Sequence, residues 1–269
     1  MRAFYLTRGV ALLLAATSSY GFDLQDYRAF DLTHAYDAKT LYWPSKPPMQ
    51  FEMQKLAEGK TPGGWYYAAN RVCTPEHGGT HLDAPIHFSE RGQTSEQLPL
   101  EKLMAPGVRI DVTRLAQGDR NYRLSRQDVL AFEQRAGRIK PGTIVLLHTG
   151  WSRFWPDRMK YFGDASTEDA SRLTFPGYGE DAARLLVEER QVAMLGVDTA
   201  SIDYGRSQDF IVHRVAAAQN VGGLENLTGL DALPETGFTV IALPMKIAGG
   251  SGGPVRVVAL VPKGDARKP

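Results

Sequence analysis

His77-Gly-Gly-Thr-His81-Leu-Asp83-Ala-Pro-Ile-His87-Phe88 holds three imidazoles and one carboxylate within twelve residues. Such a density of ligand-type side chains indicates a metal site. A helix with ligands four residues apart is excluded, because two adjacent glycines follow His77 and Pro85 interrupts the segment. The glutamate that follows the first histidine in the His-Glu-x-x-His motif of helical zinc proteases is also missing.

An extended strand accounts for the spacing from His81 onward. His81, Asp83 and His87 share one parity with Pro85, and the residues of the other parity are apolar, so one face would be polar and the other buried. The proline predicts an edge strand or a bulge, and the glycines let the chain turn so that His77 reaches the same point. Two imidazoles and a carboxylate are a usual ligand set for Zn, Mn or Fe(II). The alternative is a set of ordinary polar residues on an exposed strand.

The segment also matches a longer pattern, His-x-Gly-Thr-His-x-Asp-x-Pro-x-His, at every fixed position. Related motifs lie before it, at Asp31-Leu-Thr-His34, and after it, at His148-Thr-Gly-Trp151, His213 and Gly-Leu-Glu225-Asn. In these motifs the sequence resembles the cyclase family of metal-dependent hydrolases, which includes bacterial kynurenine formamidase and isatin hydrolase. The resemblance implies a hydrolase whose cofactor is a divalent metal ion, Mn or Zn.

The resemblance also implies roles for individual residues. The metal ligands that it implies are His77, His81 and Asp83. His87 is expected nearby as the acid or base, and His213 and Glu225 are expected to complete the site. Glu225 would bind metal or share the proton transfer.

Gln219 is a weaker candidate for a further ligand, in a single-metal site like that of isatin hydrolase. Six residues separate it from His213, and six steps of 100° leave the two side chains far apart around one straight helix. If both serve the site, the helix ends between them or directs only one of them inward. Asn220 and the glycines that follow are suitable terminators.

Length and composition set the broader limits. A chain of 269 residues with 43% hydrophobic content is expected to form one domain with a sizeable core. The net charge of +1 and the dispersed lysines and arginines give no electrostatic argument for a nucleic-acid or membrane partner.

The N-terminal segment is predicted to be a secretory signal peptide over residues 1–21. Arg2 and Arg8 precede an apolar run over residues 9–16, and small residues follow it. The run is far shorter than the roughly 20 residues that a membrane-spanning helix needs. The mature domain would cover residues 22–269 and be periplasmic or secreted, with a buried first helix as the alternative. Cys73 is the single cysteine, which excludes an intrachain disulfide, and its apolar neighbours predict a buried thiol.

The rest of the chain alternates strand-like and helix-like segments. Strands rich in β-branched residues are predicted over residues 108–112, 143–147, 192–197, 239–243 and 255–261. Helices are predicted over residues 125–136, 179–190 and 209–220, the first with a start that resembles a capping box. This order predicts an α/β fold with a mixed sheet. The family resemblance sharpens it to a swivelling β/β/α-type single domain that assembles as a homodimer.

Gly249-Gly-Ser251-Gly-Gly253 matches the G-x-S-x-G elbow of serine hydrolases, but its context argues against that function. The elbow requires a helix after the serine and a later histidine, whereas Pro254 and a predicted strand follow, and the last histidine is His213. The segment is predicted to be a flexible glycine loop.

Trp65 and Trp151 flank segments that the resemblance places at the site. They are candidates to line a pocket for a small aromatic amide substrate, although large aromatics more often serve the core. His148 is interpreted as a strand-end histidine or as a residue that orients a ligand. The role of His34 is left open.

The predicted reaction is hydrolysis of an amide by metal-activated water, with His87 shuttling the proton. The cyclic amide of isatin and the formyl amide of N-formylkynurenine both suit such a site, and the predicted export signal favours isatin. Two other classes stay open. One is an Fe(II) oxygenase that uses His81-x-Asp83 and a distant histidine, and the other is a periplasmic metal-binding protein without catalysis.

Overall fold

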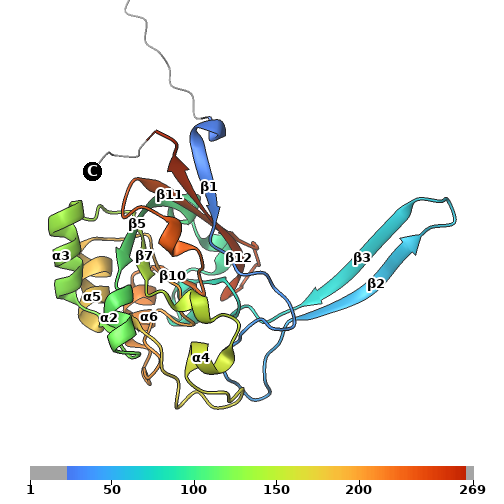
Figure 1. Ribbon diagram of the computed structural model, residues 1–269, viewed down its shortest axis with the longest axis horizontal. Helices are drawn as coiled ribbons and strands as arrows, with labels where there is room; N and C mark the ends of the chain where they lie inside the picture. Colours follow the sequence, from blue (N-terminus) through green and yellow to red (C-terminus); the bar gives the residue numbers. More distant parts are fainter. Residues whose placement is uncertain (1–22, 265–269) are drawn as a thin grey trace, which may run out of the picture.

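Eight strands form one mixed sheet in the order β1-β12-β11-β5-β7-β9-β10-β4 (Figure 1). A further pairing between β12 and β4 closes the sheet into a barrel, and β1 extends it beyond β12. The strands are β1 (Tyr27–Asp31), β4 (His81–Asp83), β5 (Met104–Asp111), β7 (Ile144–His148), β9 (Met194–Val197), β10 (Gly222–Glu225), β11 (Phe238–Pro244) and β12 (Gly252–Pro262). The neighbours β5, β7, β9 and β10 run parallel, and the other pairs are antiparallel. The predicted mixed α/β fold is confirmed.

The computed structural model describes residues 23–264. The signal peptide predicted over residues 1–21 lies outside these residues. Among the described helices, none combines the length and the apolar character that crossing a bilayer requires.

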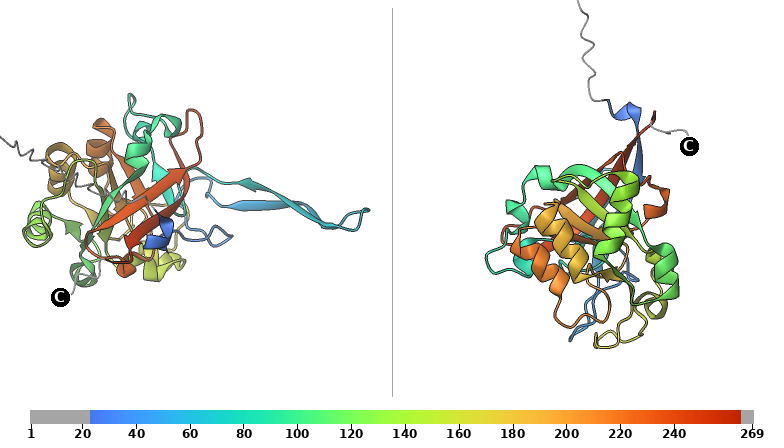
Figure 2. Two further views of the ribbon diagram at one scale, coloured as in Figure 1. Left: turned by 90° about the horizontal axis from the view of Figure 1, so that it is seen from above. Right: turned by 90° about the vertical axis from the view of Figure 1, so that its left-hand side faces the viewer.

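Helices cover one side of the barrel (Figure 2, right). The helices whose apolar side chains pack on this side are α3 (Arg126–Ala136), α5 (Glu180–Arg184) and α6 (Ile211–Ala218). The remaining short helices are α1 (Leu100–Leu103), α2 (Thr113–Gly118) and α4 (Arg158–Phe162), and the buried side chains of α1 and α4 belong to other apolar clusters. α5 continues into a π-helical turn over Leu185–Glu189. The predicted capping box at the start of α3 is present, because Ser125 and Asp128 each accept the other's backbone N–H. A short parallel pair, β6 (Arg123–Leu124) and β8 (Gly177–Tyr178), lies beside these helices.

Two apolar cores follow from the alternation of side chains along the strands. In β7, Ile144 and Leu146 belong to the core inside the barrel, whereas Val145 and Leu147 belong to the core between the sheet and the helices. The period-two pattern therefore lets one strand serve both layers.

A long hairpin projects from the barrel, and it was not predicted (Figures 1 and 2). It consists of β2 (Glu52–Lys60) and β3 (Tyr66–Cys73), in which no residue is buried. Its exposed apolar side chains include Met53, Leu56, Tyr66, Tyr67 and Val72. Cys73 is exposed at its end, so the predicted buried thiol is wrong. The apolar neighbours of Cys73 indicated burial, but a two-stranded arm outside the barrel offers no core.

Candidate active site

The short strand β4 carries two of the predicted ligands between two partner strands. Its register with β10 places Glu225 opposite His81 and Gly223 opposite Asp83. Directly opposite residues of antiparallel strands point to the same face, as do residues two apart along one strand. Glu225 therefore joins His81 and Asp83 on one face.

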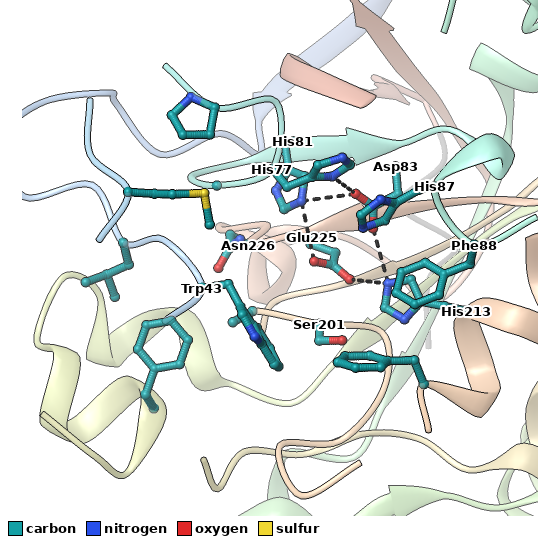
Figure 3. Close-up of a pocket in the computed structure, with 17 residues that line it drawn as sticks. Trp43, His77, His81, Asp83, His87, Phe88, Ser201, His213, Glu225 and Asn226 are labelled. Atoms are coloured by element: carbon teal, nitrogen blue, oxygen red, sulfur yellow. Dashed lines mark hydrogen bonds and ion pairs between the residues drawn. The ribbon is translucent and has the colours of Figure 1, made fainter. Parts of the chain in front are cut away.

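His77 reaches this face through a glycine turn, as predicted. Gly79 has a φ of 58°, and a Cβ there would lie 2.6 Å from the ring of Tyr36. The Tyr36 hydroxyl oxygen lies 2.7 and 2.6 Å from the carbonyl oxygens of Gly78 and Thr80, and its single hydrogen is shared between these two acceptors, which holds the turn. His77 Nδ1 consequently lies 2.6 Å from an oxygen of Asp83 (Figure 3).

His213 enters from α6 and faces two carboxylates. Its Nε2 lies 3.2 Å from Asp83 Oδ2 and 3.1 Å from Glu225 Oε1. Its Nδ1 lies 2.7 Å from Asp203 Oδ2, which also accepts the His213 backbone N–H. A carboxylate behind an imidazole fixes the orientation and tautomer of the ring. Asp203, which was not predicted, therefore directs Nε2 toward the cluster.

His87 lies at the site, but its backbone conformation differs from the predicted strand. β4 ends at Asp83, and residues Pro85–His87 form a 3-10 turn because the fixed φ of proline suits the start of a helix. The prediction of one strand through His87 is therefore wrong. Its ring nevertheless stacks on His77, with centroids 3.8 Å apart and planes 15° apart. His87 keeps an open edge toward solvent, but desolvation by its surroundings, supported by the neighbouring imidazoles, lowers its pKa to about 4, so the ring is neutral at pH 7.

Charge is concentrated in the buried part of the cluster, where His81, Asp83, His213 and Glu225 are each at most 6% exposed. Burial opposes ionisation of Asp83, but His81 and His77 hold its pKa well below the ordinary value. Burial likewise opposes the charge on His81, yet Asp83 and Glu225 raise its pKa to about 9. Burial and the Asp83 charge raise the pKa of Glu225. The paired carboxylates thus require compensation by protons or by a metal ion.

The donor atoms fit a divalent metal ion. Two sets have their ligand atoms within 4.8 Å of one another, namely His77, Asp83 and His87, and His81, Asp83 and Glu225. Imidazole nitrogens and carboxylate oxygens are the donors that Zn²⁺ and Mn²⁺ accept in proteins. Asp83 belongs to both sets, so it would contribute a ligand whichever set holds an ion.

An apolar cavity of about 300 Å³ opens over the cluster (Figure 3). Its apolar walls are formed by Leu41, Trp43, Met49, Pro75, Phe88, Phe162, Ala200 and Phe210. Trp43 and Phe210 pack together with ring centroids 5.8 Å apart. The size and lining suit a small aromatic molecule. Trp43 and Phe210 were missed because neither lies near the metal motif in sequence.

Neither tryptophan predicted to bind substrate lines this cavity. Trp151 is 1% exposed, and its Nε1–H donates to the Tyr161 carbonyl at 2.7 Å. It packs in the core behind Phe162, which does line the cavity. Trp65 is 60% exposed in the turn of the hairpin. Both assignments are corrected, because proximity to a motif in sequence does not show which way a large ring is turned.

Gln219 does not join the donor atoms. It is exposed after the end of α6 and lines a separate surface depression with Lys102 and Glu188. Its proposed role as a ligand is therefore corrected, since six residues of helix turn it away from His213.

The two undecided histidines lie outside the cavity lining. His148 ends β7, and its Nδ1 lies 3.2 Å from Asp111, as expected for a strand-end histidine. His34 stacks on Trp155 with centroids 4.3 Å apart. These contacts of the two histidines are with residues outside the candidate active site.

The fold and the site define a hydrolase class in which a closed mixed sheet holds imidazoles and carboxylates beneath an apolar pocket. The family model described as "Putative cyclase" matches residues 30–204, which is well over half of the chain. The chain belongs to this cyclase family, and it is a hydrolase.

Individual relatives agree with this classification. The chain is 31% identical over 227 residues to isatin hydrolase of Roseibium aggregatum, covering 81% of this chain and 84% of the relative. It is 25% identical to kynurenine formamidase of Salinibacter ruber, covering 85% and 95%. A crystal structure of an isatin hydrolase bound to the product analogue thioisatinate superposes with a TM-score of 0.82 at 27% identity, covering 89% of this chain and 94% of that chain.

Proposed function

We propose that the protein hydrolyses the cyclic amide of isatin to isatinate with a divalent metal ion, Mn or Zn, as cofactor. The observation that carries this proposal is the buried cluster of imidazoles and carboxylates at the floor of an aromatic-lined cavity. The similarity to isatin hydrolases over most of the chain supports the choice of substrate. Family membership favours this class over an Fe(II) oxygenase or a protein that only binds metal.

The metal would be held by His77, His81 and Asp83, with Glu225 in the second donor set. A divalent ion held there would supply Lewis-acid chemistry, making water acidic enough to be deprotonated near pH 7 and polarising the substrate carbonyl. Gln219 has no part in this proposal.

Side chains of the pocket would bind the substrate and transfer the proton. Trp43, Phe88 and Phe210 would hold the aromatic ring of the substrate. His87 is neutral and stacks on His77, so it is placed to take a proton from the attacking water. It would return this proton to the amide nitrogen as the C–N bond breaks and the water oxygen completes the carboxylate. The apolar walls limit the access of other water.

Assembly and location are further parts of the proposal. We infer a homodimer, because a two-stranded hairpin with exposed apolar side chains is not stable alone in water and calls for a covering surface. The predicted signal peptide supports a periplasmic or secreted location. The closed sheet supports the swivelling β/β/α class implied by the resemblance. Sedimentation of the purified protein and sequencing of its mature N-terminus test the first two points.

The decisive experiment measures metal content and turnover of isatin and N-formylkynurenine on the same preparation. We expect bound divalent metal, ring opening of isatin, loss of turnover with chelator, and recovery with Mn²⁺ or Zn²⁺. Cleavage of N-formylkynurenine with isatin left intact would assign the protein to the formamidases instead. Turnover that survives complete metal removal would refute the metal-dependent mechanism.

A pair of variants tests the role of His87. His87→Ala is expected to keep the metal and lose about 10²-fold to 10⁴-fold in kcat, the usual contribution of a positioned acid or base. Ser89→Ala, two residues further on, is the matched control and is expected to retain turnover. Full turnover in His87→Ala would remove this residue from the mechanism.

A further inference from the structure

The glycine loop before β12 is held in place, although the sequence predicted a flexible segment. The Ser95 hydroxyl and backbone N–H both donate to the Gly250 carbonyl, at 3.2 and 2.9 Å. The Ala84 N–H donates to the Ser251 carbonyl at 2.8 Å. The loop is thereby fixed to the segment that follows the ligand strand β4.

Ser251 in this loop contacts the metal motif directly. Its hydroxyl oxygen lies 2.8 Å from His77 Nε2. The same hydroxyl donates to Glu76 Oε2 at 2.5 Å, and the Ser251 backbone N–H donates to that oxygen at 3.1 Å. The approach requires glycine at the next position, because a Cβ on Gly252 would lie 2.6 Å from His77 Cε1.

The positions of the hydrogens follow from counting donors. A serine hydroxyl has one hydrogen, and here Glu76 accepts it, so the Ser251 oxygen can only accept from His77. His77 Nε2 therefore carries a hydrogen. In the neutral ring Nδ1 is then a lone pair, and it lies 2.6 Å from Asp83 Oδ1. The Nδ1 lone pair and the Asp83 oxygen are both acceptors, and at this distance they repel one another unless a cation or an additional proton lies between or beside them.

We propose that Glu76 and Ser251 are positioning residues that fix His77 as its Nε2–H tautomer and so reserve Nδ1 for the metal ion. This inference rests on the proposed metal centre. It gives the G-x-S-x-G segment a role that requires no nucleophilic serine. Residues that orient a metal-bound imidazole in this way usually change metal affinity by 10-fold to 100-fold when they are replaced.

Three variants and two measurements test the proposal with Zn²⁺ as the probe. Ser251→Ala removes the acceptor for Nε2–H. Glu76→Met keeps a side chain of similar length but removes both acceptor oxygens, which frees the serine hydrogen for His77. Glu96→Gln is the control, because Glu96 accepts the Gly249 N–H at 3.0 Å in the same loop and an amide oxygen can still do so. Chelator competition gives the affinity, and ¹⁵N shifts of labelled histidine give the His77 tautomer.

We expect Ser251→Ala and Glu76→Met to bind Zn²⁺ at least 10-fold more weakly and to lose the pure Nε2–H tautomer, with Glu96→Gln within about twofold of the parent. If the parent protein binds no Zn²⁺, the proposed metal centre itself fails. If the parent binds Zn²⁺ and both variants keep its affinity and its His77 tautomer, only the role of Glu76 and Ser251 is refuted. Glu76→Met, which leaves Ser251 in place and removes only its acceptor, keeps the test decisive if Ser251→Ala does not fold.

Discussion

Replacing Asp203 with asparagine tests whether the buried carboxylate behind His213 organises the site. Asp203 is 1% exposed, and both of its oxygens accept backbone N–H groups. Oδ1 accepts from Val212 at 3.1 Å, and Oδ2 accepts from the backbone and ring of His213 at 3.1 and 2.7 Å. These bonds, acting against burial, lower the pKa of Asp203. An amide must point its NH₂ at one of the two backbone donors, whichever way it is turned.

The loss of folding stability caused by Asp203→Asn can be worked out from this geometry. A buried backbone N–H without an acceptor costs about 1–3 kcal/mol, and a hydrogen bond to a charged group contributes about 1.5–3 kcal/mol. Asp203→Asn should therefore lower the free energy of unfolding by about 3 kcal/mol. His213 also loses the acceptor that fixes its tautomer. Because its Nε2 lies 3.2 Å from Asp83 and 3.1 Å from Glu225, this change disturbs two of the proposed ligands, and Zn²⁺ affinity should fall about 10-fold.

Urea unfolding and chelator competition measure the two effects separately. Asp209→Asn is the matched control, since Asp209 is exposed and, within residues 23–264, its side chain accepts one long hydrogen bond, from the Ser207 hydroxyl at 3.4 Å. The control should stay within about 0.5 kcal/mol of the parent, as surface substitutions usually do. If Asp203→Asn matches this control in both stability and Zn²⁺ affinity, the inferred role of Asp203 in orienting His213 is refuted.

Three further predictions concern protons and the pocket. Because the pKa of His81 is raised to about 9 in the metal-free chain, Zn²⁺ binding at pH 7 should release protons. The binding enthalpy measured by calorimetry should therefore change with the ionisation enthalpy of the buffer, and the same enthalpy in every buffer would contradict proton release. Burial lowers the pKa of His34 to about 4, below its unfolded value, so its stabilising effect is complete above about pH 6.5 and is lost as the pH falls toward 4. His34→Phe keeps the stack on Trp155 and should remove about 3 kcal/mol of this pH dependence from urea unfolding in chelator. An unchanged dependence of stability on pH would contradict the assignment. Trp43→Ala should raise KM for isatin about 10-fold with the metal content unchanged, and an unchanged KM would exclude Trp43 from substrate binding.

The donor cluster could be predicted because its spacing is set by local geometry. His81 and Asp83 lie two apart on a strand, and the glycine turn returns His77 to them, so short-range rules sufficed. Glu225 and His213 came from the family resemblance, since only the pairing of β10 with β4 and the placement of α6 bring them close. The chain beyond Asp83 departed from the period-two prediction because Pro85 starts a helical turn.

The residues that were missed depend on contacts between distant segments. Ser251 contacts His77 across 174 positions, and Trp43 meets Phe210 across the cavity. The hairpin arm was missed for another reason. Its strands have no buried face, and the period-two pattern that predicts a strand arises from burial of one face.

Barrel closure explains how a strand of three residues can carry the site. β4 is held on one edge by β10, which supplies Glu225, and on the other by β12, which continues the loop of Ser251. Each partner strand therefore both completes the hydrogen bonds of β4 and delivers a polar group to the same cluster. Because a short isolated strand would not keep two imidazoles and two carboxylates together against their cost of burial, the closed sheet is a physical requirement for the site.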